Sequence, residues 1–452
     1  MRKVFLTSLT IITSLAVIWS PGKTYSLVVN LIFSVISIIS SYFIFSDTHR
    51  HFTLLKTFNI FSLTFMGIAP VVQFKGEAEL WGERLYESDY VAAGLAYLLA
   101  LVVFLVTYYL EKKKNKGIRL AKRLYTKPIE KLEISRKKIL FLILVSSGLF
   151  CYVFYIKGFN YLEMFLRGTI DDITSSAGLQ ETKTSNMVGL LNENFIRPIN
   201  SLLAICFCVL YGRRHKITSA VLFFIAFMTM APTAVARFAA AAIYLPVLMV
   251  LFPVVRRSHN YAITLVCGLL VVWPMLSAFR YFDVESDLAF SLGLKDLFES
   301  GNMDSFSSLA RVMKYDIVTG GRQLLGVLLF WVPRFLWANK PIGSGAFLAQ
   351  TINLDFENLA CNYFAEGYIN FGFIGVAGYA IVLAIVLARI DNMFWNSTQS
   401  GKSNSAFFTC FYYMALGLLF FILRGDGLSS FAYTVGFSVA LCVSRFILRL
   451  KI

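Results

Sequence analysis

Charged side chains are scarce in this sequence. Only 15% of its 452 residues are Asp, Glu, Lys or Arg, whereas 57% are hydrophobic, and the mean hydropathy is +0.67. Soluble globular proteins carry about 25% charged residues. The composition therefore excludes a soluble domain and predicts a polytopic membrane protein.

Cysteine and histidine are also few, and neither is spaced for a metal site. The seven cysteines form no disulfide framework and no metal-ligand pattern. All four histidines fall in segments predicted to be cytoplasmic: His49, His51, His215 and His259. No phosphate-binding loop, dinucleotide-binding glycine motif or Ser-His-Asp constellation is present. We therefore expect no metal ion and no cofactor.

Twelve apolar stretches, most of them near the twenty residues that cross a bilayer, predict twelve transmembrane helices. They cover residues 4–20, 25–46, 53–73, 90–110, 139–157, 195–212, 217–232, 238–255, 261–279, 368–389, 406–423 and 429–448. The first stretch lacks a small-residue cleavage site, so it predicts an anchor and not a signal peptide. The predicted fold class is an all-α polytopic membrane protein.

The 42 basic residues outnumber the 26 acidic ones, and their placement predicts an orientation. Most lie in alternate connections between the spans, above all in residues 111–138, which hold twelve Lys or Arg and three Glu. By the positive-inside rule these connections and both termini are cytoplasmic. This distribution favours a topological signal over nucleic-acid binding, although an anionic-lipid or partner surface at 111–138 stays possible.

Three parts follow along the chain. Residues 1–279 hold the first nine spans, residues 280–367 form one large outside loop, and residues 368–452 hold the last three spans. The loop is too charged to lie in a bilayer and too long for a simple connection. We expect it to form the floor of an active site for an anionic, lipid-linked substrate.

Four arginines are predicted to lie outside at membrane depth, where the positive-inside rule does not explain them. They are Arg237, Arg280, Arg334 and Arg424. A guanidinium group binds a phosphate through two parallel hydrogen bonds, so these residues predict a diphosphate site. The alternative is local pairing with a carboxylate, for example Arg280 with Asp283 or Arg424 with Asp426.

Two acidic residues are candidates for a catalytic role. Glu366 stands just before a span and between aromatic residues, where partial burial suits a general base. It could instead be a carboxylate that favours a helix N-terminus. Asp426 is the second catalytic candidate.

Aromatic residues near these groups are candidates for sugar contact. Trp331, Trp337 and Tyr363 could pack on glycan rings, although the two tryptophans could equally anchor the chain at the membrane interface. Residues 330–343, around Arg334, predict an amphipathic helix lying at that interface.

Four short motifs are similar to those of bacterial Wzy-type polymerases, which join repeat units of O-antigen and other surface polysaccharides. They are residues 66–70 (MGIAP), 333–341 (PRFLWANKP), 362–372 (NYFAEGYINFG) and 423–426 (LRGD). The resemblance implies a GT-C-like glycosyltransferase of the bacterial inner membrane, with undecaprenyl-diphosphate-linked oligosaccharide as both donor and acceptor. It also implies a chain-length regulator as a partner.

Within this resemblance, the four outside arginines would bind the diphosphate in place of a metal, and Glu366 would activate the acceptor hydroxyl. O-antigen ligases share the layout but generally carry an outside histidine in the large loop, which this chain lacks. A glycan transporter or flippase would need charged or broken spans around a midplane cavity. Both remain alternatives to the polymerase.

Overall fold

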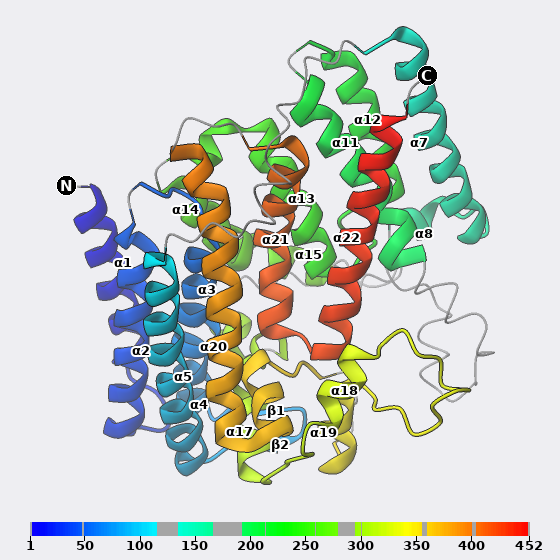
Figure 1. Ribbon diagram of the computed structural model, residues 1–452. Coiled ribbons are helices and arrows are strands. Elements are labelled where there is room, and N and C mark those ends of the chain that lie inside the picture. Colours follow the sequence, from blue (N-terminus) through cyan, green and yellow to red (C-terminus); the bar gives the residue numbers. More distant parts are fainter. Residues whose placement is uncertain are drawn as a thin grey trace.

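The computed structural model describes residues 2–47, 49–114, 134–165, 192–212, 214–257, 259–278, 294–299, 301–354, 359–399 and 404–450. Within these ranges the chain is a bundle of helices with one two-stranded hairpin (Figure 1). Eight helices in the described ranges are long and apolar enough to cross a membrane, and four shorter apolar helices accompany them. The structure therefore agrees with the prediction of an all-α membrane protein.

The N-terminal half contains nine helices and the two strands within the described ranges. Its helices are α1 (Arg2–Ile18), α2 (Leu27–Ser46), α3 (Leu54–Phe61), α4 (Ala69–Gly76), α5 (Glu87–Lys113), α7 (Arg136–Ile156), α8 (Tyr161–Phe165), α11 (Arg197–Tyr211) and α12 (Lys216–Thr229). Two π-helical turns, Ser62–Ile68 and Asn192–Ile196, continue directly into α4 and α11. The hairpin strands are β1 (Glu79–Leu80) and β2 (Glu83–Arg84).

The C-terminal half contains both long and very short helices. They are α13 (Arg237–Leu251), α14 (Asn260–Cys267), α15 (Trp273–Ala278), α16 (Leu294–Glu299), α17 (Ser305–Lys314), α18 (Arg322–Leu328), α19 (Ser344–Thr351), α20 (Tyr363–Gln399), α21 (Ala406–Arg424) and α22 (Gly427–Arg449). Short 3-10 turns cover Pro253–Arg256 and Gly301–Met303, and a π turn, Gly268–Val272, joins α14 to α15.

Each predicted span coincides with a helix or with a continuous run of helical turns. The helices at the first, seventh, eighth and ninth predicted spans have 17 residues or fewer. At 1.5 Å per residue, such a helix reaches about 26 Å at most, less than the hydrocarbon core of about 30 Å. Length and composition therefore support eight spans, and the number twelve stays a prediction.

Polar side chains define where several of these helices begin. Ser26, Thr53, Ser135 and Ser405 each accept a hydrogen bond from the backbone N–H three residues later, at the starts of α2, α3, α7 and α21. Such a cap satisfies one of the amide groups that have no partner in the first helical turn. Apolar runs thus set the helix lengths, and capping residues set their starts.

The helices pack in two groups. One buried cluster joins α2 to α5 with α20 and includes Phe58 stacked on Phe104, with ring centroids 3.7 Å apart. A second cluster joins α7, α11, α12, α13 and α22. Helix α21 contributes Leu419 to the first cluster and Leu418 to the second, and it packs along α13. Because lipid is as apolar as leucine, close packing and not water exclusion holds such helices together.

The hairpin and helices α16 to α19 gather at one end of the bundle, the lower end in Figure 1, called here the hairpin end. Glu83 of the hairpin accepts hydrogen bonds from Arg311 at 2.8 Å and from Lys314 at 2.6 Å. The Gln73 amide donates to the carbonyls of Phe298 and Met303 at 2.9 and 3.0 Å. These bonds fix parts of the large loop onto the hairpin end.

The prediction that residues 330–343 form a helix is wrong. Helix α18 ends at Leu328, and turns follow up to Gly343. Pro333 and Pro341 have no backbone N–H to continue a helix. Side chains within the segment occupy its carbonyls instead, since Lys340 Nζ donates to Phe330 and Val332.

Candidate functional site

The turn between α21 and α22 is the centre of the candidate site. It consists of Arg424, Gly425, Asp426 and Gly427 and lies at the hairpin end. Asp426 caps α22, since its Oδ1 accepts from the backbone N–H of Ser429 at 2.9 Å. Asp426 thus has a helix-capping role in the structure, and its predicted catalytic role stays a prediction.

Arg424 is held by the large loop. Its Nη2 donates to Asp304 Oδ1 at 2.9 Å and to the Gly301 carbonyl at 3.3 Å. The Asp304 carboxylate is buried, so this charge-assisted bond is poorly screened by solvent. The pairing that sequence analysis left open for Arg424, with Asp426, is replaced by a partner 120 residues away.

Arg237 and Arg424 meet at one tryptophan. The guanidinium carbon of Arg237 lies 4.9 Å from the Trp273 ring centroid, and that of Arg424 lies 5.7 Å from the same side chain. Each cation–π contact contributes about 0.5–2 kcal/mol, depending on how well water is excluded. The first turn of α13, the end of α21 and the start of α15 therefore bring two of the four predicted arginines together.

Glu366 is buried at the other side of the same turn. It is only 2% exposed, where sequence analysis expected partial burial. Its Oε1 accepts from the backbone N–H of Gly427 at 2.6 Å, and its Oε2 accepts from the Ser344 hydroxyl at 2.8 Å. The carboxyl group is thus bonded to the Arg424–Gly427 turn and to the start of α19.

Two glycines allow the close approach of these carboxyl groups to the neighbouring turns. A Cβ atom on Gly427 would lie 3.2 Å from the Glu366 carboxyl, and one on Gly343 would lie 3.0 Å from Asp426 Oδ1. Both distances are tighter than ordinary van der Waals contact. A side chain at either position would therefore displace the neighbouring carboxyl group by a few tenths of an ångström.

Asn370, one helical turn after Glu366, contacts the backbone of α20. Its amide nitrogen donates to the Glu366 carbonyl at 2.8 Å and to the Tyr379 hydroxyl at 3.1 Å. Tyr363, a predicted glycan contact, packs instead against Tyr379, with ring centroids 5.0 Å apart. Its side chain is partly buried at the start of α20, close to the proposed base.

The remaining predicted residues lie apart from this cluster. Arg334 is exposed and donates to the Lys340 carbonyl at 3.0 Å. Trp331 is 69% exposed in the same segment, and Trp337 is half-buried there. Arg280 and the basic residues from 115 to 133 lie outside the described residues.

Sequence reasoning missed the groups that hold the charged residues in place. Asp304, Ser344 and Trp273 all contact a predicted site residue. Asp304 and Ser344 lie within the large loop, and no spacing connects them to Arg424 or Glu366. Only the tryptophan carried a signal, because an aromatic ring near the end of a span is common at interfaces.

Comparison of the chain with protein-family models, with curated proteins and with solved structures finds no match. Within the described ranges, no group of three or more His, Cys, Asp and Glu side chains is placed to hold a metal ion. The charged residues around the α21–α22 turn are therefore the main evidence for what the protein does.

Proposed function

We propose that the protein is a membrane-embedded glycosyltransferase that polymerises lipid-diphosphate-linked oligosaccharide repeat units. The observation that carries the proposal is the Arg424–Gly427 turn. Its Gly427 amide donates a hydrogen bond to the buried Glu366 carboxylate, and its Arg424 shares the Trp273 ring with Arg237. A cation pair beside an acceptor of protons is what transfer from a diphosphate needs. The sequence resemblance to Wzy-type polymerases also supports the proposal, and two of its motifs contain Glu366 and Arg424.

In the proposed reaction, an acceptor sugar hydroxyl attacks the anomeric carbon of the donor glycan. The new C–O bond forms as the bond from that carbon to the diphosphate oxygen breaks. Glu366 accepts the hydroxyl proton, and the lipid diphosphate leaves with the bonding electrons. Arg237 and Arg424 stabilise the negative charge that develops on the leaving group.

We further propose the orientation and location that the sequence predicted. Twelve spans, eight long and four short, would place both termini in the cytoplasm and the hairpin end outside the bacterial inner membrane. The GT-C-like fold and a chain-length regulator as partner are proposed on the resemblance alone.

Transport is the less supported alternative. A buried acid in a span is a common feature of transporters, and Asp391 of α20 is fully buried. However, its oxygens accept hydrogen bonds from the Leu54 and Leu55 amides and from the Tyr108 and Tyr412 hydroxyls. Four donors saturate this carboxylate, so it has the environment of a structural clamp between helices.

The proposed function is tested in cells that lack the gene and express single variants. Arg424→Ala should remove the polymer ladder of surface glycan and leave single repeat units, because export and ligation do not depend on this protein. The matched control is Arg389→Ala, which removes an arginine paired with Glu111 at 2.8 Å at the opposite end of the bundle. A ladder in the Arg424→Ala cells, or loss of all surface repeats at normal protein level, would contradict the polymerase proposal.

A further inference from the structure

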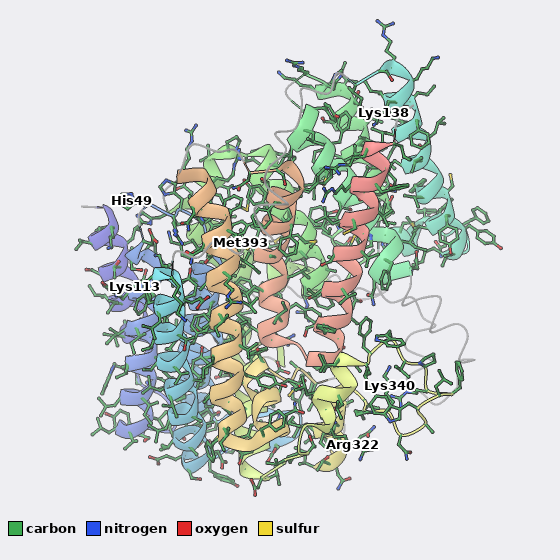
Figure 2. The ribbon with its side chains drawn as sticks, viewed as in Figure 1. His49, Lys113, Lys138, Arg322, Lys340 and Met393 are labelled. Atoms are coloured by element: carbon green, nitrogen blue, oxygen red, sulfur yellow. The ribbon has the colours of Figure 1, made fainter. Side chains whose placement is uncertain are left out.

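Helix α18 and the turns that follow it form an apolar projection, defined here as residues 322–341 (Figures 1 and 2). Many of its large apolar side chains are exposed. Leu325, Leu328, Trp331, Phe335 and Leu336 are between 51 and 84% exposed. In α18 these exposed positions recur three residues apart, while Gln323 and Gly326 are buried, so the helix turns its apolar face outward.

The projection is internally tied by its own basic residues. Lys340 Nζ donates to the Phe330 carbonyl at 2.5 Å and to the Val332 carbonyl at 2.9 Å. Arg334 donates to the Lys340 carbonyl at 3.0 Å, and Arg322 to the Asn339 carbonyl at 3.2 Å. These bonds satisfy backbone carbonyls, which would otherwise be costly to place in lipid.

Elsewhere in the same predicted loop, large apolar side chains are buried. Helix α17 buries Phe306, Leu309 and Val312 completely. The side chains of the apolar projection are instead as exposed as apolar side chains on the outer faces of the long helices. Leu144 of α7, for example, is 61% exposed. It lies beside the start of α22, with Phe330 against Phe431 at 5.7 Å between ring centroids.

The charge of the projection indicates what covers it. Arg322, Arg334 and Lys340 are all basic, and within the described ranges none of them forms an ion pair with a carboxylate. Figure 2 places Arg322 and Lys340 together at the lower right, far from Lys138 at the other end of the bundle. The exposed apolar and aromatic side chains are thus flanked by positive charges that no described carboxylate neutralises. This combination matches the headgroup layer of a membrane that contains anionic lipid.

We propose that the apolar projection inserts into the membrane interface and binds anionic phospholipid headgroups. This part of the large loop is then a lipid-contacting element and not a segment exposed to water. It assigns Trp331 to lipid, whereas sequence analysis also considered a glycan contact. The proposal does not depend on the proposed enzyme activity.

The test uses the full-length protein in nanodiscs that contain brominated phosphatidylglycerol, whose bromine quenches tryptophan fluorescence on contact. Trp331→Phe should remove a strongly quenched part of the emission. The matched control is Trp81→Phe, because Trp81 lies against Gly301 and its Nε1 donates to Asp304 at 3.2 Å. Removing Trp81 should remove emission that the bromine does not quench. If the emission lost with Trp331 is equally insensitive to brominated lipid, the proposal is overturned.

The headgroup preference is tested in the same samples. With Arg322→Gln and Arg334→Gln combined, quenching of Trp331 by brominated phosphatidylglycerol should fall at least twofold, to the level seen with brominated phosphatidylcholine. A parent protein that is quenched equally by both lipids would show insertion without recognition of anionic headgroups, and would overturn that part of the proposal.

Discussion

At the scale of single residues, the candidate chemistry depends on how Glu366 is held. The Gly427 amide and the Ser344 hydroxyl each bond one of its oxygens, so both oxygens have fixed directions. Burial to 2% exposure removes competing water from the carboxyl group. A base in this setting has little freedom to lose when the acceptor hydroxyl arrives.

Replacing Glu366 with glutamine tests this role with the least change in shape. Because the amide can accept no proton at neutral pH, Glu366→Gln should lower polymerisation by about 10²–10⁴-fold, as expected for loss of a general base. The rate of chain growth in membranes, at equal protein level, is the measurement. Ser344→Ala keeps the carboxylate and removes only one hydrogen bond, so it should lower the rate far less. Equal losses in both variants would contradict the role of Glu366 as base.

Glu83 tests the electrostatics of the hairpin end. Burial alone would raise its pKa, but hydrogen bonds from Lys314 and Tyr315, and the charge of Arg311, lower it below the ordinary value of 4.5. A lowered carboxyl pKa stabilises the folded state above the unfolded pKa, and this stability is lost as the pH falls through the folded pKa.

The expected result is a pH-dependent difference between the parent protein and Glu83→Gln. At neutral pH the variant should be less stable by about 1–3 kcal/mol, as for loss of hydrogen bonds to a charged group. Below pH 4.5 the difference should shrink, because Glu83 of the parent protein becomes protonated. Thermal unfolding in detergent at several pH values measures this. A difference that stays constant down to the lowest pH would show that the ion pairs do not stabilise the hairpin end.

At the scale of elements, the kink in α20 positions the first turns of the helix. Phe371 and Gly372 depart from helical geometry, and Gly372 has a φ of 61° and a ψ of −146°. That region of backbone conformation is essentially restricted to glycine. The kink separates the turn that carries Glu366 from the longer C-terminal part of α20.

Gly372→Ala should therefore strain the kink and destabilise the protein by about 1–3 kcal/mol. Gly378→Ala is the matched control in the same helix, because a Cβ atom there meets nothing within 4 Å. The control should be neutral or slightly stabilising, since alanine is the better helix former. The measurement is the free energy of unfolding of both variants in the same detergent. Equal stability of the two variants would mean that the kink does not require glycine.

Sequence analysis located the helices well and the contacts between distant segments poorly. Apolar length and basic flanks are local properties. The predicted span 406–423 therefore matches α21 to within one residue, and 368–389 falls inside α20, which is longer at both ends. The Arg424 partner was not, because Asp304 approaches only when the large loop folds back onto the hairpin end. The helix expected around Arg334 failed because amphipathic composition does not reveal that lysine and arginine side chains occupy the backbone carbonyls.

At the scale of the whole molecule, the candidate site lies where the two helix groups meet. Helix α20 belongs to the first buried cluster and α22 to the second, whereas α13 and α21 contribute residues to both. Arg237, Arg424 and Glu366 come from three of these helices at the hairpin end. A site at such a junction lies between two packed bodies, which is a common place for a ligand to bind.

The proposed orientation predicts which residues are accessible from outside the cell membrane. In a cysteine-free background, Glu79→Cys at the hairpin and Lys113→Cys at the opposite end place one thiol at each end of the bundle, and both positions are exposed. A membrane-impermeant maleimide should label the first in intact spheroplasts and the second only after lysis. The reverse pattern would place the hairpin end in the cytoplasm and would contradict the proposed orientation.

The most direct test of the central claim is reconstitution of the purified protein in nanodiscs with a lipid-diphosphate-linked repeat unit as the only substrate. The account predicts a ladder of longer glycans that stay attached to the lipid carrier, with release of one free lipid diphosphate for each bond formed. The Arg424→Ala protein should be incorporated into the same nanodiscs to the same extent and yield no ladder. Release of lipid diphosphate without longer glycans, or no reaction by the parent protein with the repeat unit of its own cells, would contradict the assignment as a polymerase.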